Sequence, residues 1–417
     1  MFKGKNKRTI PTEVFTPKGH IVNDEMYITR PALEKQLRRA LDGTYHIIIH
    51  GESGSGKTWL YKKVLKELGC EYIPINLPNA SSRQSISEAF TMFLNQLSNV
   101  KKTAYSETKE AELNVVAAKG KLNHTLQFEL VEKEPFLQCL EYVRKKAKER
   151  KALIVFENFE AIFQDTKLMK ELGNLILLLD DDIYAKYDVK FLIVGTPSEI
   201  KEYFANTENA SSISNRLEEI SEVAKLDKYQ VELFVEKGFV DKLKFQGDSN
   251  TLTTLKEDVY WSTLGIPQRM HEYCLKIAYS LEDNDWQLNE NVLKEAKISW
   301  IKQSLTMNYS NIELLMNSNE TRVQRKNQVL FALGRINKDS FKYTDVEDVI
   351  KREFPTSSNV KMNISQVLSE LSSNDKSPIR KTIKGDSYTF TDPKFLMSLR
   401  LMLFKTTNEK VEKLSIN

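Results

Sequence analysis

The stretch IIIHGESGSGKTWL, residues 47–60, decides the fold of this chain. Within it Gly51, Gly56, Lys57 and Thr58 fit G-x-x-x-x-G-K-[ST], the pattern of a phosphate-binding loop. The largely apolar, β-branched run before the loop predicts a buried parallel strand, and the segment after it has apolar residues at helical spacing. A chance glycine-rich turn is the alternative, but the strand–loop–helix context favours a nucleotide site.

Such a loop binds phosphate through physical features that the sequence already contains. Backbone N–H groups and the N-terminus of the following helix point at the phosphates. Lys57 is then expected to contact the β- and γ-phosphates, and the Thr58 hydroxyl to hold Mg²⁺. The expected cofactors are therefore ATP or ADP with Mg²⁺. The predicted binding residues of this segment are Gly51, Glu52, Ser53, Gly54, Ser55, Gly56, Lys57, Thr58 and Trp59.

The composition is that of an ordinary globular chain. Its 417 residues suggest two or three domains, and 41% hydrophobic residues suffice for their cores. The net charge of +4 is mild and does not by itself indicate nucleic acid. Cys70, Cys139 and Cys274 lack metal-binding spacing and predict buried thiols in a reducing compartment. With no long apolar run or signal-peptide pattern, we expect a soluble cytoplasmic protein that does not enter a membrane.

Strands and helices alternate along the first half of the chain. Further strands are predicted at 71–77, within 152–163 and within 189–200, and helices at 31–41, 81–100 and 136–151. This alternation predicts an α/β fold, a parallel sheet with helices on both faces. Residues 101–133 are polar and weakly patterned, and we interpret them as an insertion.

The second half changes character. Residues 227–300 are helical throughout, and from about residue 319 three helices are followed by two strands around a Lys-Gly-Asp turn. Three helices and a hairpin predict a winged helix-turn-helix. A last helix within 388–405, which includes Phe404, is too apolar to stand in water and must dock. The basic residues 1–20 predict a partly ordered arm, or else a strap that packs on the nucleotide or a neighbour.

These features together resemble the AAA+ class of phosphate-loop ATPases, particularly its origin-recognition-like and STAND-like branches that carry a winged helix after a lid. The resemblance covers roughly residues 25–405. It implies a parallel-sheet P-loop NTPase core with a helical lid, followed by a winged helix-turn-helix domain. The implied division is 1–24 a basic arm, 25–225 the ATPase core, 226–300 the lid, 301–318 a linker, 319–405 the winged helix and 406–417 a tail.

The resemblance assigns roles to the acidic segment after the third strand. The family has an Asp followed by a Glu there, whereas this chain has Glu157 followed by Asn158. Glu157 takes the magnesium position, and Asn158 replaces the glutamate that polarises the attacking water. An amide cannot accept a proton, and general-base effects are about 10²–10⁴ in rate. We therefore expect slow or partner-triggered hydrolysis, unless Glu160 or Glu52 reaches the water.

Two further residues match family positions on the core. Thr196 matches the polar strand tip that touches the γ-phosphate or positions the water; the alternative is a threonine in a tight turn before Pro197. Arg216 lies where the family carries an arginine finger, which acts in trans across a subunit interface. The alternative is a surface arginine paired with Glu219.

The lid and the start of the core supply the remaining matches. Pro267 opens the helix that follows a Gly-x-Pro turn, and Arg269 would reach back to the γ-phosphate, with Gln268 as the alternative. Near the start of the chain, Tyr27 and Arg30 match the segment that packs the adenine.

The C-terminal module could read DNA. Its recognition helix would be 362–371, with Asn363, Ser365 and Gln366 as the base-reading candidates. The wing would be 380–390, and the basic cluster that would contact phosphate is Lys376, Arg380, Lys381 and Lys384. The alternative is a module that packs on the ATPase or on a partner.

The leading hypothesis is an ATP-binding switch that assembles as a homo-oligomer and signals to a protein effector on another chain. Bacterial antiviral defence or mobile-element conflict would suit such a device by family analogy only. The alternative is a DNA-binding ATPase of the loader or transposition-regulator type. A third reading is a scaffold that holds nucleotide permanently for stability.

Overall fold

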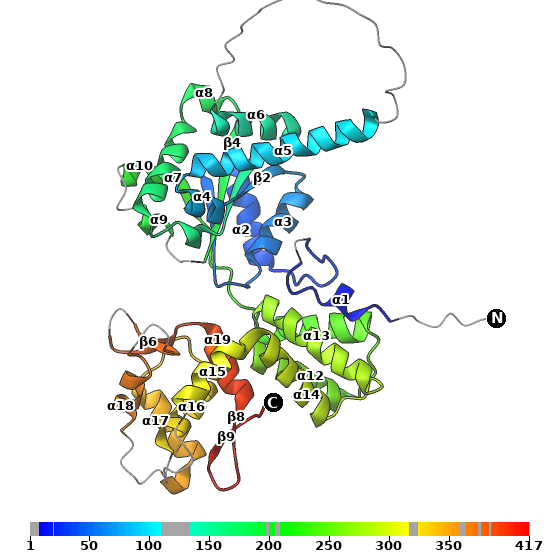
Figure 1. Ribbon diagram of the computed structural model, residues 1–417, viewed down its shortest axis with the longest axis vertical. Helices are drawn as coiled ribbons and strands as arrows, with labels where there is room; N and C mark the ends of the chain where they lie inside the picture. The colour runs from blue at the N-terminus through cyan, green and yellow to red at the C-terminus, as the bar shows by residue number, and fades with distance from the viewer. Residues whose placement is uncertain are drawn as a thin grey trace, which may run out of the picture. The chain divides into compact units, whose positions relative to one another are not determined.

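The computed structural model describes residues 8–19, 21–109, 134–196, 200–204, 209–316, 324–357, 363–373, 377–382 and 385–416. These residues form two compact units: 29–224, called the core unit below, and 1–28 with 225–417, called the C-terminal unit (Figure 1). Most of the predicted insertion, residues 110–133, lies outside the described residues, as do residues 1–7 of the basic arm.

A five-stranded parallel sheet forms the centre of the core unit, with strand order β2-β3-β4-β1-β5. Its strands are β1 (His46–His50), β2 (Glu71–Asn76), β3 (Ala152–Glu157), β4 (Val189–Gly195) and β5 (Leu217–Glu219). The predicted α/β class is confirmed. The sequence did not predict β5, because two of its three residues are glutamates and carry no apolar strand signal.

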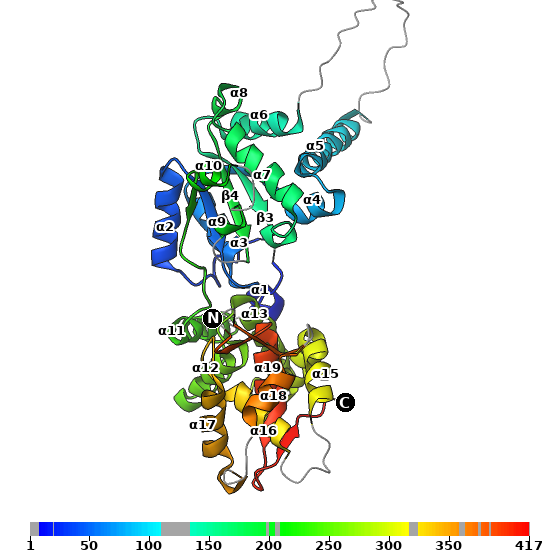
Figure 2. The ribbon, with the colours of Figure 1, turned by 90° about the vertical axis from the view of Figure 1, so that its left-hand side faces the viewer.

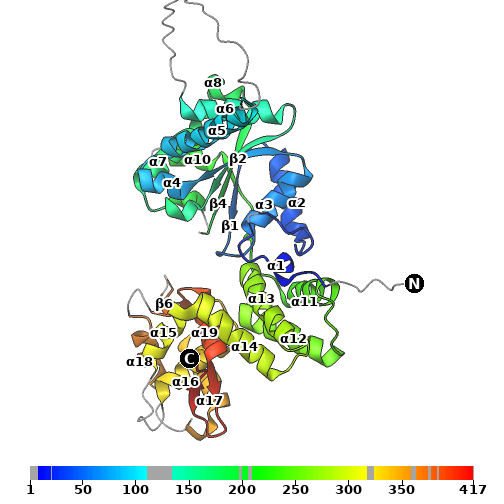
Figure 3. The same ribbon diagram turned by 45° about the vertical axis from the view of Figure 1, so that its right-hand side comes forward.

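Helices cover both faces of this sheet because its strands are apolar on both faces. Successive strand side chains point to opposite faces. Ile48, Ile154 and Phe156 join one hydrophobic cluster, whereas Ile47 and Val155 join the other. Figure 3 shows α2 and α3 on one side of the strands and α4, α5 and α7 on the other. These helices are α2 (Pro31–Asp42), α3 (Lys57–Glu67), α4 (Leu77–Arg83), α5 (Ile86–Lys109), α6 (Pro135–Ala147) and α7 (Thr166–Leu178).

The single helix predicted over 81–100 is two helices. Between α4 and α5 the backbone of Gln84 turns left-handed, with φ 56°. The start of α5 is then capped from elsewhere in the chain. The Glu171 carboxylate of α7 accepts hydrogen bonds from the backbone N–H groups of Ile86 and Ser87, each at 2.9 Å. A cap supplied by a distant residue leaves no local signal.

The remaining helices of the core unit are short. The short helices are α8 (Asp182–Ala185), α9 (Ile200–Tyr203), α10 (Ala210–Ser214) and a 3₁₀ turn at Phe159–Ala161. All three cysteines of the chain are free thiols; Cys139 and Cys274 are buried and Cys70 is half-buried.

The C-terminal unit is mainly helical and shares one hydrophobic cluster from residue 226 to residue 411. Its first helices are α11 (Lys228–Val235), α12 (Ser249–Thr263), α13 (Pro267–Asp283), α14 (Glu290–Trp300) and α15 (Thr306–Leu315), with π-helical segments at Glu236–Lys242 and Ile301–Leu305. The later elements are α16 (Arg325–Arg335), α17 (Tyr343–Glu353), a 3₁₀ turn at Pro355–Ser357, α18 (Ile364–Glu370), β6 (Ile379–Lys381), β7 (Tyr388–Phe390) and α19 (Pro393–Met402). Within the expected linker 301–318, α15 is ordered and buries Ile312.

The last apolar helix docks, as expected, but it is shorter than predicted. Helix α19 packs against α15, α16 and α12 (Figure 2). Its apolar residues are buried. Phe404 lies outside it, in β8 (Leu403–Lys405), which pairs with β9 (Val411–Lys413). Part of the predicted tail 406–417 is therefore a strand.

The described part of the N-terminal arm is a strap on its own unit. Helix α1 (Pro11–Val14) contacts α13, and the Phe15 ring lies 5.1 Å from Phe239 and 5.9 Å from Phe234. The next residue, Thr16, donates its backbone N–H to His271 Nδ1 at 3.1 Å. Residues 11–16 are therefore anchored by a buried aromatic side chain and by a hydrogen bond to α13.

Candidate nucleotide-binding site

The phosphate loop runs from the end of β1 into α3, and its three glycines all have positive φ. Gly51 has φ +149°, and a Cβ there would lie 2.5 Å from the Val223 carbonyl oxygen. Gly56 caps α3 with φ 97°, a left-handed conformation that favours glycine. Among the other predicted loop residues, Glu52 and Ser53 are exposed, Gly54 is also left-handed at φ 83°, and Ser55 is buried. Thr58 and Trp59 lie half-buried in the first turn of α3.

Lys57 lies over the loop. Its ammonium group donates to the carbonyl oxygens of Gly51 at 2.7 Å and Glu52 at 2.9 Å. Burial lowers the pKa of Lys57 to about 8, and the carboxylates of Glu160 and Glu52 oppose that shift. A partly desolvated cation attracts phosphate more strongly than one in bulk water.

Glu157 ends β3 and is held by a residue that the sequence did not single out. Tyr61 of α3 donates its hydroxyl to Glu157 Oε1 at 2.7 Å. The Tyr61 side chain is fully buried, and burial together with the Glu157 charge raises its pKa far above the ordinary value. The carboxylate at the predicted magnesium position therefore has a fixed hydrogen-bond donor on one oxygen.

Asn158 follows in the left-handed conformation, with φ 61° and ψ 51°. Its amide donates from Nδ2 to Asn76 Oδ1 at 2.7 Å, and Asn76 ends the neighbouring strand β2. Asn76 lies opposite Glu157 in the β2–β3 register, so this pairing is set by the sheet. Two amides therefore occupy the place where the family resemblance expects a carboxylate.

Glu160 connects the acidic segment to the tip of β4. Its Oε2 accepts the backbone N–H of Thr196 at 3.1 Å, and its charge acts on Lys57. The structure thus brings together Glu160, Thr196 and Lys57, which sequence reasoning placed in the same site. Pro197, which follows Thr196, lies outside the described residues.

Arg30 reaches the phosphate loop from the start of α2. Its guanidinium donates from Nη2 to the Ser55 carbonyl oxygen at 2.7 Å. Tyr27 belongs to the C-terminal unit, where it is buried and its carbonyl oxygen accepts from Lys237 Nζ at 3.0 Å. Of the two residues matched to adenine packing, the structure therefore places Arg30 at the loop.

Arg216 lies at the N-terminal end of strand β1, whereas the phosphate loop follows its C-terminal end. Its carbonyl oxygen accepts the backbone N–H of His46, the first residue of β1, at 2.9 Å. Its guanidinium pairs with Asp180, so the alternative pairing with Glu219 is wrong; Glu219 instead accepts from Ile200 N and lies 3.6 Å from His50 Nε2.

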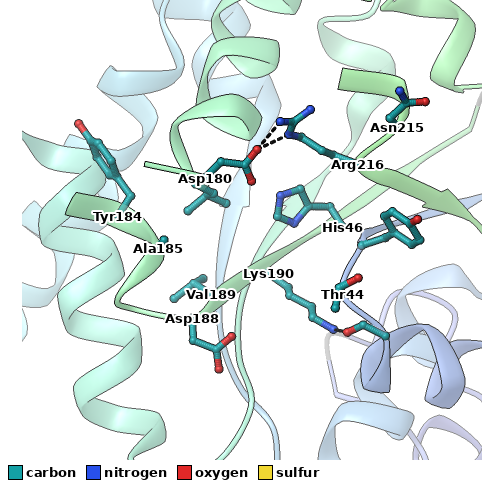
Figure 4. A pocket seen from close by; sticks show the side chains of 13 residues that line it. Thr44, His46, Asp180, Tyr184, Ala185, Asp188, Val189, Lys190, Asn215 and Arg216 are labelled. Atoms are coloured by element: carbon teal, nitrogen blue, oxygen red, sulfur yellow. Dashed lines mark hydrogen bonds and ion pairs between the residues drawn. The ribbon is translucent and has the colours of Figure 1, made fainter. Parts of the chain in front are cut away.

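A pocket of about 510 Å³ surrounds this ion pair. Figure 4 shows the Arg216–Asp180 pair above the His46 ring, with Lys190 below it. His46 is nearly buried, and its Nδ1 accepts the backbone N–H of Phe191 at 3.2 Å. Burial lowers the pKa of His46 to about 4, so its ring is neutral near pH 7.

The lid candidates lie at the start of α13 in the C-terminal unit. Pro267 is its first residue, as predicted, and follows Gly265, which has φ +72°. Arg269 donates to Glu272 Oε1 at 2.7 Å, and Gln268 donates to the same oxygen at 3.1 Å. Glu272 is nearly buried, so it holds both candidate side chains on the surface of their own helix.

The C-terminal basic residues are partly engaged. Arg380 and Lys381 lie exposed on β6, and Ser365 and Gln366 lie exposed on α18. Lys326 pairs with Glu370 at 2.5 Å. The candidates Lys376 and Lys384 are outside the described residues, whereas Asn363 is exposed just before α18.

The donor set of the core unit fits magnesium held together with a nucleotide. Among the described residues, no group of three or more His, Cys, Asp or Glu side chains could form a metal site by itself. Mg²⁺ commonly takes one or two carboxylates plus phosphate oxygens and waters. Glu157 and the Thr58 hydroxyl are such a partial set. The described helices also include none with the length and apolar character to cross a membrane.

Comparisons with known proteins agree with this geometry. Residues 39–204 match a family model described as an AAA domain. No curated protein matches the chain. A Walker-type ATPase of Pyrococcus abyssi has a similar structure, with a TM-score of 0.53 and 16% identity over 91% of this chain and 97% of that chain.

Two further solved structures are more distant. The ORC2 protein of Aeropyrum pernix in its ADP form gives a TM-score of 0.48 at 13% identity, over 91% of this chain and 93% of its own. Cdc6p of Pyrobaculum aerophilum gives 0.45 at 14% identity, over 95% and 98%. Because the TM-scores of these two structures are below 0.5, only the Pyrococcus structure bears on the fold. The phosphate loop, the parallel sheet and the family match agree that residues 39–204 are similar to an AAA domain.

Proposed function

We propose that this protein is an ATP-binding switch of the AAA+, STAND-like kind, in which hydrolysis is slow or is triggered by a partner. The observation that carries the proposal is the Asn158–Asn76 pair, 2.7 Å apart at the ends of β3 and β2. It puts an amide, which cannot accept a proton, at the position that the resemblance assigns to the water-activating glutamate.

The residues around the loop have different proposed roles in binding ATP. The backbone of the loop and the start of α3 face the phosphates, and Lys57 supplies the positive charge. Thr58 and Glu157 would hold Mg²⁺, which neutralises charge on the phosphate oxygens. Thr196 and Glu160 are joined to each other and lie beside this site. Glu160 and Glu52, whose charges both act on Lys57, are the carboxylates proposed as a weak base.

The response to ATP would pass through assembly. Arg216 is proposed to reach the nucleotide of a second copy, since the length of β1 separates it from its own loop. Arg269 is proposed to sense the γ-phosphate after leaving Glu272. The module after residue 324 would then signal to a protein effector on another chain. A cytoplasmic setting and a role in bacterial antiviral defence complete this hypothesis and rest on analogy alone.

Lys57→Ala tests the proposal, because removing this ammonium should abolish ATP binding and ATP-dependent assembly together. Fluorescent ATP titration and light scattering would measure the two. Lys66→Ala is the matched control, since Lys66 is an exposed lysine on the same helix. A Lys57→Ala protein that assembles normally would contradict the switch.

The alternative is a DNA-binding ATPase of the loader or transposition-regulator type. It is supported by the order of α16, α17, α18 and the β6–β7 pair, three helices and a hairpin as in a winged helix, and by the exposed Arg380 and Lys381. Binding through such a wing depends steeply on salt. Neutralising Arg380, Lys381 and Lys384 should then weaken DNA binding; unchanged affinity would exclude this reading.

A further inference from the structure

The hydrogen bond between Tyr61 and Glu157 joins two elements of the candidate site. Tyr61 Oη donates to Glu157 Oε1 at 2.7 Å across 96 positions of sequence. Tyr61 follows Thr58 by three residues on α3, so the two side chains lie on one face of that helix. The bond therefore ties the helix face that carries the Thr58 hydroxyl to the carboxyl end of β3.

We propose that Tyr61 is a positioning residue for magnesium, which fixes the Glu157 carboxylate so that its second oxygen is directed to the metal. The inference rests on the proposed function and deepens it. A glutamate has one more rotatable bond than the aspartate that the family resemblance expects at this position. A fixed donor on Oε1 removes that freedom before the metal arrives.

The surroundings of Tyr61 make its hydroxyl a rigid donor. The side chain is fully buried in the cluster between the sheet and α2–α3. Its ring meets the Tyr72 ring edge-on, with centroids 6.0 Å apart and planes at 88°. A ring packed on all sides cannot swing its hydroxyl away, so the Glu157 carboxylate must come to it.

The proposal predicts an unusual effect of restoring the family residue. Glu157→Asp shortens the side chain by one C–C bond, about 1.5 Å. The carboxylate would then leave the 2.7 Å contact with the Tyr61 hydroxyl. In this chain Glu157→Asp should therefore weaken magnesium binding, although the family expects Asp.

The test is a MgCl₂ titration of fluorescent N-methylanthraniloyl-ATP binding by the full chain. Tyr61→Phe should raise the Mg²⁺ concentration at half-effect about tenfold, the lower end of what losing a residue behind a metal ligand costs. The affinity for the same nucleotide in EDTA should stay within about twofold of wild type. The melting temperature of the protein should be unchanged. Tyr72→Phe is the matched control, because it keeps the ring and removes a neighbouring hydroxyl that feels the Glu157 charge but is not seen to donate to that carboxylate.

A second measurement separates positioning from packing. In the Glu157→Asp background, adding Tyr61→Phe should produce little further change, since the bond is already lost; such non-additivity marks a direct partnership. An unchanged Mg²⁺ midpoint in Tyr61→Phe, an equal shift in Tyr72→Phe, or a loss of metal-free binding would each overturn the inference. Wild-type protein that shows no Mg²⁺-dependent ATP binding at all would instead overturn the proposed function.

Discussion

Individual side chains decide how the candidate site is held. Glu157 and Asn158 are adjacent at the end of β3, yet each has a different partner, Tyr61 from α3 and Asn76 from β2. Gly51 lies beside the Val223 carbonyl oxygen and leaves no room for a side chain. Each of these three contacts depends on atoms placed within a few tenths of an ångström.

Gly51→Ala should destabilise the core unit by about 3 kcal/mol, because the added Cβ would lie 2.5 Å from a backbone oxygen and φ +149° disfavours alanine. Urea unfolding measures the loss. Gly43→Ala is the matched control: Gly43 has φ −67°, and its nearest atom to an added Cβ lies at 3.5 Å. Equal stability of the two variants would show that the close approach of the loop to Val223 is not required.

At the residue scale the sequence predicts the motif residues but does not predict the side chains that form hydrogen bonds with them. Lys57, Thr58 and Glu157 follow from local patterns, and the structure brings Lys57 together with Glu160 and Thr196. Tyr61 and Asn76 carry no such pattern. Their roles depend on strand register and helix packing, which join residues 96 and 82 positions apart.

Within the core unit, strand β1 separates Arg216 from the phosphate loop. Arg216 precedes β5 and is bonded to the first residue of β1, whereas the phosphate loop follows the last. A strand rises about 3.3 Å per residue, so roughly 13 Å of strand lies between them. From this end of β1, Arg216 could act only on a nucleotide that is bound to another copy of the protein.

Arg216→Ala should therefore lower ATP turnover only where copies are assembled. In an Asn158→Glu background, we expect a loss of at least about tenfold at high protein concentration and none at concentrations where the protein is monomeric. Asp180→Asn is the control, because it removes the charge of the ion-pair partner and leaves the Arg216 guanidinium in place. An equal loss in the monomer would contradict action in trans.

Across the whole molecule, each compact unit contains a buried neutral histidine. Burial lowers the pKa of His46 in the core unit to about 4 and that of His271 in the C-terminal unit to about 3. Each accepts a backbone N–H on Nδ1, which requires the unprotonated nitrogen. The unfolded chain takes up these protons near pH 6.5 and the folded chain does not.

Stability should therefore fall as pH drops below 6.5 and continue falling toward pH 4. At pH 5 each histidine should cost its unit about 2 kcal/mol relative to pH 7.5, at about 1.4 kcal/mol per pH unit. Urea unfolding at both pH values measures the difference. His46→Asn and His271→Asn should each narrow it by a similar amount; an unchanged difference in both variants would assign the pH dependence to other groups.

The sequence predicts the main architecture of the molecule better than its short strands and helix breaks. Apolar strands alternating with helices are sufficient to predict the parallel sheet. The three-residue β5, the α4–α5 break and the β8–β9 pair were missed, because their signals are tertiary: strand pairing to β1, a cap from Glu171, and pairing of Leu403 with Lys413. The sequence leaves the role of residues 11–16 open, since only the fold shows the aromatic rings that Phe15 packs against.

The central claim is that Asn158 limits hydrolysis, and steady-state ATP turnover tests it most directly. Wild-type protein and Asn158→Glu would be measured side by side, alone and with DNA. We expect wild type to be nearly silent and Asn158→Glu to be faster by about 10²-fold or more, as restoring a general base should allow. Wild-type turnover near about 1 s⁻¹ or above, within the usual range of enzymes, would contradict the claim and show that another carboxylate serves as the base.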